Sequence, residues 1–485
     1  MGASFVDVLN FIRAKGESVK VRAKYQDFFV DDVISDSRDV KPGTLFACIA
    51  GENSDGHDFV SSAEERGACA LLCEREVDSP LPQIIVPRVR DYLGEVAAIV
   101  YGHPAEKLLM VGVTGTNGKT TTTYITRSIL QAAGIRTGLL GTIIESDGLT
   151  EKDADRTTPE SCIVQRQLAN MVKNGCGACV METSSHGLYL GRLKGARYDV
   201  AVFTNLYPEH LDFHVNMQNY FEAKRLLFTT YTKENFTGAA NYDDEYGRKL
   251  AAEFPGQVRG FGLSEGAESR VTSSRTTLNG TDLVINGSLN LHSPLVGDFN
   301  IMNVLCAVTA MRGRVDDDAI IRGVANVPQV PGRLERIDLN NGACVFVDFA
   351  HTPSALRSVL GTIRRLSGNE RRIVSVFGHG GGRYQQNRPE LGKAASEFAN
   401  EIIITSDNAR DEDPVKIAEA IAGGATIPYR IMTDRPEAVN YALDSLNAGD
   451  ILVVTGKGPE KFITIKNHKI PFNDAEAVKA WRDSH

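Results

Sequence analysis

An α/β fold of three domains is what this sequence predicts, and two observations lead to it. Short apolar runs alternate with amphipathic segments of helical length, which is the pattern of strands covered by helices. The chain has 485 residues, which is too long for a single hydrophobic core. At roughly 150 residues per domain, this length predicts about three domains. We expect domains at residues 1–107, 108–330 and 331–485, with the second break in the Pro- and Gly-containing segment 327–333.

The charge balance excludes several classes of partner. With 53 Lys and Arg against 61 Asp and Glu, the net charge is −8, which gives no overall attraction for nucleic acid or for an anionic membrane. The N-terminus lacks the pattern of a signal peptide, and no run of about 18 apolar residues occurs. We expect a cytoplasmic monomer that acts on small molecules, with no nucleic-acid partner and no membrane insertion.

The cysteines do not predict a disulfide or metal framework. Eight cysteines in a chain of this size are too sparse for a disulfide scaffold. Cys176 and Cys179 have the spacing of a redox or zinc motif, but no second such pair follows them. We interpret both as small buried residues.

In chain order, the first block contains turns at 36–43 and 51–58, and the later blocks contain strands that end in polar loops. The apolar run 108–113 leads through a Gly- and Thr-rich loop into a helix that ends near Gly134. Ligands collect at the carboxyl ends of parallel strands, so the polar loops are candidate sites. The further strands are predicted at 178–183 and 199–205, and within 344–351, 372–383, 401–414 and 450–460.

The segment TGTNGKTTTT, residues 114–123, is typical of a phosphate-binding loop. Glycines allow backbone N–H groups to approach phosphate oxygens, and the helix N-terminus adds positive potential. Lys119 would neutralise charge on the β- and γ-phosphates, and Thr120 would ligate Mg²⁺. The strict P-loop spacing requires glycine where Val113 stands, so the loop is a variant. Its predicted ATP-binding residues are Gly115, Thr116, Asn117, Gly118, Lys119, Thr120 and Thr121.

Two side chains that follow predicted strands are candidate metal ligands. Glu182 is the fourth residue of the run CVMET, which begins at Cys179, and His210 lies in TNLYPEHLDFH. A carboxylate and a neutral imidazole at adjacent strand ends could hold a divalent ion beside the phosphates. Lys224, in YFEAKRLLF, is an ammonium and does not ligate a cation, so its residue type predicts only a solvated lysine.

Taken together, these motifs resemble the Mur ligase superfamily. TGTNGKTT is similar to its ATP loop, which folylpolyglutamate and cyanophycin synthetases also share. ETSSHGL, TNLYPEHLDFH and EAKRLLF, in that order, resemble the branch that synthesises muramyl tripeptides. The resemblance implies an N-terminal UDP-binding α/β domain, a central P-loop-type ATPase domain and a Rossmann-like C-terminal domain. It also implies a carbamylated Lys224 that orders Mg²⁺ together with Thr120, Glu182 and His210.

The resemblance assigns three further groups of binding residues. Around ATP it places Asn241, Asp243, Asp244, Asn300, Asn303, Arg333, Asp348 and His351. Around the UDP-muramyl dipeptide it places Ser35, Ser37, Glu52, Asn53, Ser54, Thr157, Thr158, Ser184 and Arg192. Around the incoming amino acid it places Arg383, Asp407, Asn408, Ala409, Arg410, Gly456 and Glu460.

The implied reaction is ATP-dependent ligation of meso-diaminopimelate to UDP-N-acetylmuramoyl-L-alanyl-D-glutamate through an acyl phosphate. Arg410 would hold the distal carboxylate of diaminopimelate, which lysine lacks. L-Lysine or another diamino acid, a folylpolyglutamate-type ligase and a nucleotide-binding protein without ligase activity stay as alternatives. The sequence departs from the family pattern at Arg156, Leu190, His379, Gly382, Ala409 and Pro459.

Overall fold

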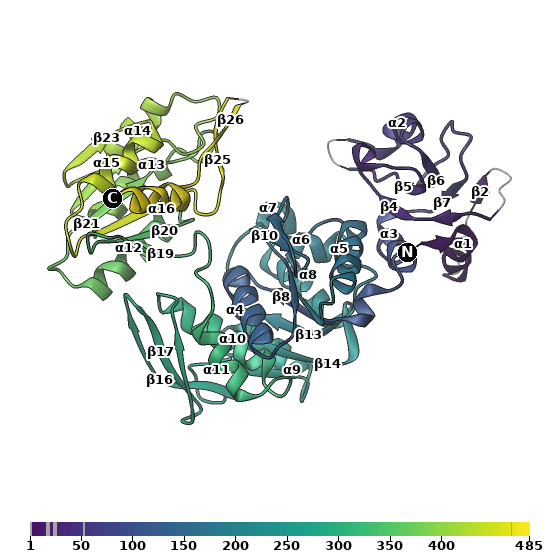
Figure 1. Cartoon of the computed structure of the whole chain (residues 1–485), viewed down its shortest axis with the longest axis horizontal. Helices are drawn as coiled ribbons and strands as arrows, with labels where there is room; N and C mark the ends of the chain where they lie inside the picture. The colour runs from purple at the N-terminus through teal and green to yellow at the C-terminus, as the bar shows by residue number, and fades with distance from the viewer. Residues whose placement is uncertain (1, 16–19, 23–26, 52–53, 467) are drawn as a thin grey trace. The chain divides into compact units, whose positions relative to one another are not determined.

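The computed structural model describes residues 2–15, 20–22, 27–51, 54–466 and 468–485 (Figure 1). Contacts within the chain divide it into two compact units. The first comprises Met1–Val271 and Asn303–Gly323, and the second comprises Thr272–Met302 and Val324–His485. Within the described residues, no helix is long and apolar enough to cross a membrane.

The N-terminal part of the first unit is a sheet with helices on both faces. Its strand order is β2-β7-β6-β5-β4, parallel from β4 to β7. Leu45 and Ala47 of β5 pack with α1 and α3 on one face, and Phe46 packs with α2 on the other. The elements are β1 (Ala3–Ser4), α1 (Phe5–Ala14), β2 (Lys20–Arg22), β3 (Phe29–Val30), β4 (Asp32–Ile34), β5 (Thr44–Ala47), α2 (Val60–Glu65), β6 (Ala68–Cys73), β7 (Gln83–Ile85) and α3 (Leu93–Val100).

A second, larger sheet follows, and those of its strands that lie or begin in the first unit have the order β11-β10-β9-β12-β8-β13-β14-β15-β16. It is parallel from β9 to β16, and Met110, Met181 and Phe203 of its central strands pack with α5, α8 and α9. Its strands are β8 (Leu109–Thr114), β9 (Thr137–Leu140), β10 (Ile144–Ser146), β11 (Glu151–Asp153), β12 (Ala178–Glu182), β13 (Tyr198–Phe203), β14 (Thr232–Asn241), β15 (Val258–Gly262) and β16 (Ser269–Thr277). Its helices are α4 (Lys119–Ala132), α5 (Ser161–Lys173), α6 (Ser185–Tyr189), α7 (Leu211–His214), α8 (Met217–Thr229), α9 (Glu245–Glu253), α10 (Phe299–Met311) and α11 (Asp317–Ala325).

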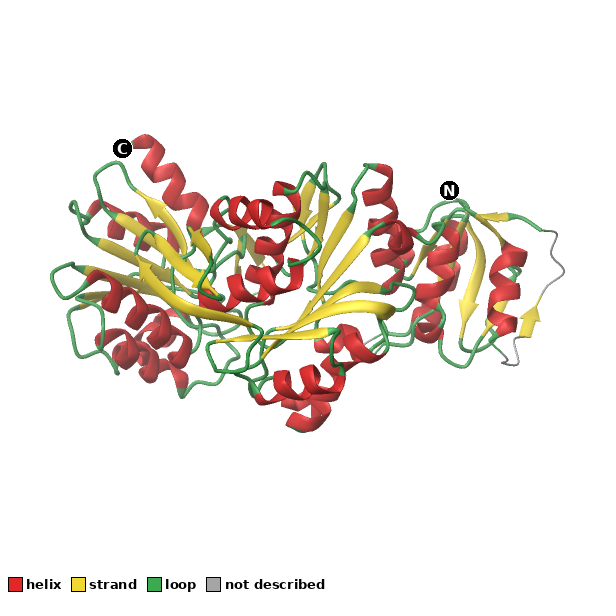
Figure 2. Cartoon of the chain, turned by 90° about the horizontal axis from the view of Figure 1, so that it is seen from below, coloured by secondary structure: helices red, strands yellow, loops and turns green. Residues whose placement is uncertain are grey.

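The second unit contains a doubly wound sheet in the order β19-β20-β24-β21-β22-β23, with all strands parallel except β19. Figure 2 shows the helices and strands of the chain by colour. One face packs with α12, α13 and α14, and the other packs with α15 and α16. Its elements are β17 (Gly280–Ile285), β18 (Leu289–Ser293), β19 (Glu335–Asp338), β20 (Cys344–Asp348), α12 (Pro353–Ser367), β21 (Ile373–Phe377), α13 (Asn387–Ser396), β22 (Glu401–Ile404), α14 (Pro414–Ala422), β23 (Tyr429–Ile431), α15 (Arg435–Asp444), β24 (Ile451–Thr455), β25 (Phe462–Ile465), β26 (His468–Pro471) and α16 (Asp474–Ser484).

The predicted strands and the α/β class are confirmed. The three central apolar runs form β8, β12 and β13, and the four C-terminal runs form β20, β21, β22 and β24. Helix α4, which follows the phosphate loop, ends at Ala132, close to the predicted end. Gly134, with a φ of 78°, terminates it. Residues 272–302 group with the C-terminal part of the chain, because Leu278 and Val296 enter its core. The three domain boundaries themselves stay a prediction.

Candidate active site

The phosphate loop connects β8 to α4, as predicted. Its two glycines, Gly115 and Gly118, have φ values of 144° and 84°, a region that side chains rarely adopt. A Cβ at Gly118 would also collide with the Oδ1 of Asn303, and a Cβ at Gly115 would collide with the Oγ1 of Thr204. Backbone conformation and lack of space therefore both require glycine at these two positions.

Asn205, which follows β13, holds the phosphate loop. Its backbone carbonyl accepts a hydrogen bond from the N–H of Thr116 at 2.9 Å, and its Oδ1 accepts one from the N–H of Asn117 at 2.9 Å. The Nζ of Lys119 donates to the carbonyls of Gly115 and Thr116 at 3.0 and 2.8 Å. The ammonium of Lys119 thus lies at the loop that is expected to bind phosphate.

Lys224 of α8 reaches the same loop. Its side chain is buried, and its Nζ donates to the carbonyl of Gly115 at 2.7 Å. The Nζ also lies 4.5 Å from the ring centre of Tyr220, whose hydroxyl is 3.2 Å from the Oγ1 of Thr116. Burial, and next the charge of Lys119, lowers the pKa of Lys224 well below its ordinary value. The neutral amine that this favours is the form that reacts with CO₂.

Glu182 lies at the carboxyl end of β12, beside the start of the loop. In the parallel pairing of β12 with β8, Glu182 is opposite Val113. Its carboxylate is buried and accepts hydrogen bonds from the N–H and the Oγ1 of Thr142 at 2.8 and 3.0 Å. These bonds hold the carboxylate at the carboxyl end of β12, which pairs with β8, the strand that precedes the phosphate loop.

His210 immediately precedes α7 and is exposed. Its φ of 56° is uncommon for a residue with a side chain. Its ring centre lies 6.2 Å from that of Tyr220 and 4.8 Å from that of His186. Burial, followed by the charge of His210, lowers the pKa of His186. His210 and Lys224 therefore both lie beside Tyr220, although they come from different elements.

The predicted dipeptide residues of the first unit are also brought together. Thr158 donates through Oγ1 to the carbonyl of Glu182 at 3.0 Å and accepts from the N–H of Ser184 at 3.0 Å. The Nη1 of Arg192 donates to the carbonyl of Thr158 at 3.3 Å. The Oγ1 of Thr157 lies 3.1 Å from that of Thr142, the partner of Glu182. Burial lowers the pKa of the Arg192 guanidinium.

The remaining residues of the first block are less closely tied to this cluster. The Oγ of Ser35 lies 3.7 Å from the Sγ of Cys162, and Ser37 is buried as the first residue of a 3₁₀ turn. The carbonyl of Ser54 accepts the N–H of Gly51 at 2.9 Å. Glu52 and Asn53 lie outside the described residues.

Three of the predicted nucleotide residues have structural partners in the first unit. Asn241 donates through Nδ2 to the carbonyl of Thr204 at 2.9 Å. The carboxylate of Asp243 accepts the N–H of Leu263 at 2.8 Å, and Asp244 caps α9. These contacts account for their residue types without a ligand.

Four other predicted nucleotide residues lie in the second unit. Asn300 donates through Nδ2 to the carbonyl of Val296 at 2.9 Å. The guanidinium carbon of Arg333 lies 5.3 Å from the ring centre of Phe349, whose carbonyl is 2.9 Å from the Nδ1 of His351. Asp348 accepts the N–H groups of Leu334 and Ala350 at 2.7 and 2.8 Å, and burial raises the pKa of its carboxyl.

The predicted amino-acid residues lie at the carboxyl ends of β22 and β24. The Nδ2 of Asn408 donates to the Oε2 of Glu460 at 2.9 Å, and its Oδ1 accepts the N–H of Thr464 at 2.8 Å. The fully buried Lys457 donates to the same Oε2 at 2.8 Å and lies 3.9 Å from Asp407. Gly456 has a φ of 108°, and a Cβ there would meet the carboxylate of Asp407.

Arg410 lies on the rim of this site. Its φ is 51°, and its Nη1 donates to the carbonyl of Gly381 at 2.7 Å. Ala409, in the position of the family proline, is buried, and a Cβ at Gly381 would collide with its carbonyl. His379 is also buried, which lowers its pKa. Arg383 is exposed in the loop that follows.

Comparison with known proteins identifies the family. The chain matches the catalytic domain of the Mur ligase family over residues 30–101, the Mur ligase middle domain over 113–311 and the Mur ligase glutamate ligase domain over 332–458. UDP-N-acetylmuramoyl-L-alanyl-D-glutamate–2,6-diaminopimelate ligase of Chlorobaculum tepidum is 39% identical over 93% of this chain and 92% of its own length. The chain belongs to the Mur ligase family.

Other Mur ligases agree over the full length. The enzymes of the same name from Aquifex aeolicus and Bacillus licheniformis are 40% and 37% identical over 93% and 96% of this chain, and over 93% and 96% of their own lengths. A solved structure of such a diaminopimelate ligase has a TM-score of 0.70 at 29% identity and covers 100% of this chain and 99% of its own. This Mur ligase is therefore an ATP-dependent ligase that forms peptide bonds.

The sequence reasoning missed two residues of this Mur ligase. Tyr220 joins Lys224, His210 and the loop, and its spacing of four residues from Lys224 on one helical face was the available signal. Lys457 lies under the amino-acid site in TGKGPE, but its contact with Glu460 was not predicted.

Two cysteines other than Cys176 and Cys179 lie close together in space. Cys176 and Cys179 are buried, as expected. Cys48 and Cys73 have Sγ atoms 3.6 Å apart, with His57 beside them. The Nδ1 of His57 lies 2.5 Å from the Oδ1 of Asp55, and its Nε2 accepts a hydrogen bond from the backbone N–H of Glu74 at 3.0 Å. Both ring nitrogens are thus engaged within the protein, so this group is not a ready metal site.

Proposed function

We propose that this Mur ligase joins 2,6-diaminopimelate to UDP-N-acetylmuramoyl-L-alanyl-D-glutamate in the synthesis of a peptidoglycan precursor, with ATP as co-substrate. The convergence of the phosphate loop, Glu182 and Lys224 at one sheet edge carries the proposal. The full-length similarity to ligases of that name supports the choice of substrates.

The reaction would proceed in two steps. The γ-carboxylate of the D-glutamyl residue attacks the γ-phosphorus of ATP, which forms an acyl phosphate and releases ADP. The neutral amine of diaminopimelate then attacks the acyl carbon, and inorganic phosphate leaves as the amide forms. Lys119 offsets negative charge on the phosphates in the first step. Thr157, Thr158, Ser184 and Arg192 hold the acceptor, and Ser35, Ser37 and Ser54 contribute to its UDP end.

The donor set of the site fits a magnesium ion. Mg²⁺ prefers oxygen ligands, and Thr120, Glu182 and a carbamylated Lys224 each supply oxygen, with His210 as a nitrogen ligand. The lowered pKa of Lys224 favours the amine that carbamylation needs. When bound, the ion would supply positive charge beside the transferring phosphoryl group.

The second unit would contribute nucleotide and amino-acid contacts. Arg333, Asp348 and His351 are proposed for the nucleotide, with Asn303 of the first unit. Arg410 would bind the distal carboxylate of diaminopimelate through its planar fork, while Asp407 and Glu460 receive an ammonium group. Arg383, Asn408, Ala409 and Gly456 complete the proposed pocket.

The test is phosphate release with ATP, Mg²⁺ and the muramyl dipeptide nucleotide, with meso-diaminopimelate and L-lysine offered in parallel. Product mass identifies the residue that was added. Turnover with diaminopimelate alone is the expected result. Preference for lysine would keep the ligase and overturn the amino-acid assignment, and no phosphate release with either would overturn the proposal.

A further inference from the structure

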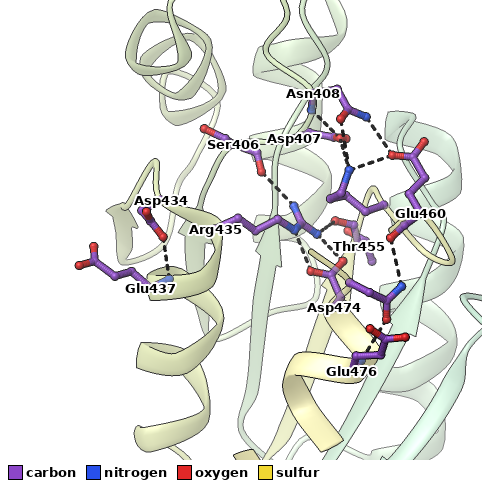
Figure 3. Close-up of polar contacts among 12 residues, drawn as sticks. Ser406, Asp407, Asn408, Asp434, Arg435, Glu437, Thr455, Glu460, Asp474 and Glu476 are labelled. Atoms are coloured by element: carbon purple, nitrogen blue, oxygen red, sulfur yellow. Dashed lines mark hydrogen bonds and ion pairs between the residues drawn. The ribbon is translucent and has the colours of Figure 1, made fainter. Parts of the chain in front are cut away.

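One buried arginine in the second unit contacts the ends of two strands that carry the proposed amino-acid site. Arg435 is the first residue of α15, and its side chain has no exposed surface. Its Nε donates to the Oδ1 of Asp474 and its Nη2 donates to the Oδ2, both at 2.8 Å (Figure 3). The side chain of Asp474 is equally buried. Two parallel bonds of this kind fix the orientation of the guanidinium as well as its position.

The same guanidinium donates to main-chain carbonyls at the carboxyl ends of β22 and β24. Its Nη1 donates to the carbonyl of Ser406 at 3.2 Å, and its Nη2 donates to that of Thr455 at 2.8 Å. Ser406 directly precedes Asp407, and Thr455 directly precedes Gly456. Arg435 therefore holds both loops at the residue before each one enters the proposed site.

Asp474 extends this connection to Glu460. It is the first residue of α16, and the preceding Asn473 caps that helix by accepting the N–H of Glu476 at 3.0 Å. The Nδ2 of Asn473 donates to the carbonyl of Glu460 at 3.0 Å. The segment from Thr455 to Glu460 is thus held at both ends, by Arg435 and by Asn473.

We infer that Arg435 and Asp474 are positioning residues that set the spacing between the loop of Asp407 and Asn408 and the loop of Gly456 and Glu460, and so determine affinity for the diamino acid. The inference rests on the proposed function. It requires arginine in particular, because a planar guanidinium can satisfy a carboxylate and two carbonyls at once, whereas the compact ammonium of lysine cannot reproduce that fork.

The opposite end of the same sheet provides a matched control. Arg372 donates to Glu401 at 2.7 Å and to Asp450 at 3.1 Å. Glu401 is the first residue of β22, and Asp450 directly precedes β24. Arg372 also donates to the carbonyl of Ser445 at 3.0 Å. Arg372 thus joins the same two strands through charged bonds, but away from the proposed site.

The experiment compares Arg435→Lys and Asp474→Asn with Arg372→Lys in the full chain. Asn473→Asp is a milder variant, because it keeps the helix cap and loses only the donor to Glu460. The measurements are the KM for meso-diaminopimelate, the KM for ATP, and hydrogen–deuterium exchange of residues 405–411 and 455–461. The exchange data need no substrate, so they decide the positioning role even if the wild-type chain does not ligate diaminopimelate.

We expect Arg435→Lys and Asp474→Asn to raise the KM for diaminopimelate about tenfold, to change the KM for ATP by less than about twofold, and to speed exchange in both segments. Asn473→Asp speeds exchange at 455–461 alone. Arg372→Lys leaves the KM and both segments unchanged. Unaltered exchange in the Arg435 and Asp474 variants overturns the inference, as does an equal effect of Arg372→Lys. Inactive wild-type protein with the expected exchange pattern overturns the proposed function alone.

Discussion

Lys224 is a lysine in a place where an ammonium is costly. It is buried, lies near Lys119 and contacts the phosphate loop through Gly115, and these surroundings lower its pKa. A residue that served only packing would be better replaced by an apolar one. The placement is explained if the amine becomes an anionic carbamate that faces the cations of the nucleotide site.

We predict that Lys224→Met lowers kcat by about 100-fold or more and does not lower the midpoint of thermal unfolding. The loss of the carbamate would remove an anionic ligand of the magnesium ion that offsets charge on the transferring phosphoryl group, while an apolar side chain of similar length fills the buried space. Steady-state phosphate release and thermal unfolding measure the two quantities. The exposed Lys249→Met, on α9, is the control, and a kcat for Lys224→Met within about twofold of that control would contradict the role.

Arg410 is the one side chain whose proposed contact would distinguish diaminopimelate from lysine. Its backbone is held on both sides, because its N–H donates to Thr464 at 3.1 Å and its carbonyl accepts from Lys466 at 2.7 Å. A charge-assisted bond contributes about 1.5–3 kcal/mol, so Arg410→Ala should raise the KM for diaminopimelate roughly 10- to 100-fold. L-Lysine lacks the distal carboxylate, and its KM should not change. Equal losses for both amino acids would show that Arg410 shapes the pocket without reading that carboxylate.

At the scale of elements, the turn from β8 into α4 depends on a glycine for two separable reasons. Gly118 and Gly134 flank α4 with φ values of 84° and 78°, but only Gly118 has a neighbour, Asn303, in the space of a Cβ. Gly134→Ala should therefore cost only about 1 kcal/mol of stability from backbone strain. Gly118→Ala should raise the KM for ATP about tenfold or more, because the backbone is strained at this φ and either the loop or the Asn303 side chain must shift. Similar ATP kinetics in both variants would contradict this reading.

The predictable elements are those whose signal is local. β8, β12 and β20 are apolar runs bounded by polar turns, so the sequence predicts both the strand and the functional loop after it. β16 is rich in Ser and Thr without an apolar alternation, and it was not predicted. The contact of Tyr220 with Thr116 joins residues 104 apart in sequence, and no local pattern contains such a pairing. Lys224 was predicted from its residue type as a solvated lysine for the same reason, because its contact with Gly115 also joins residues far apart in sequence.

At the scale of the whole molecule, the chain passes from the first unit to the second, back to the first and again to the second. The sequence predicts contiguous domains with boundaries after residues 107 and 330, and these boundaries stay a prediction. In the division by contacts, Thr272–Met302 belongs to the second unit and Asn303–Gly323 returns to the first. Helix α10 contains the crossing between Met302 and Asn303. A contiguous boundary is the natural expectation from sequence, because a segment that leaves a unit and returns to it has no compositional mark.

Val296 and Val304 test this division, because both are buried and they lie eight residues apart on opposite sides of the crossing. Each change to Ala should cost about 2 kcal/mol through lost burial and a residual cavity. Val296→Ala should speed hydrogen–deuterium exchange in β20 and α12, whose residues share its core, and leave β8 protected. Val304→Ala should speed exchange in the first unit and leave β20 and α12 protected. If both variants speed exchange throughout the chain, the two units unfold as one cooperative body, and the nucleotide and amino-acid sites do not open independently.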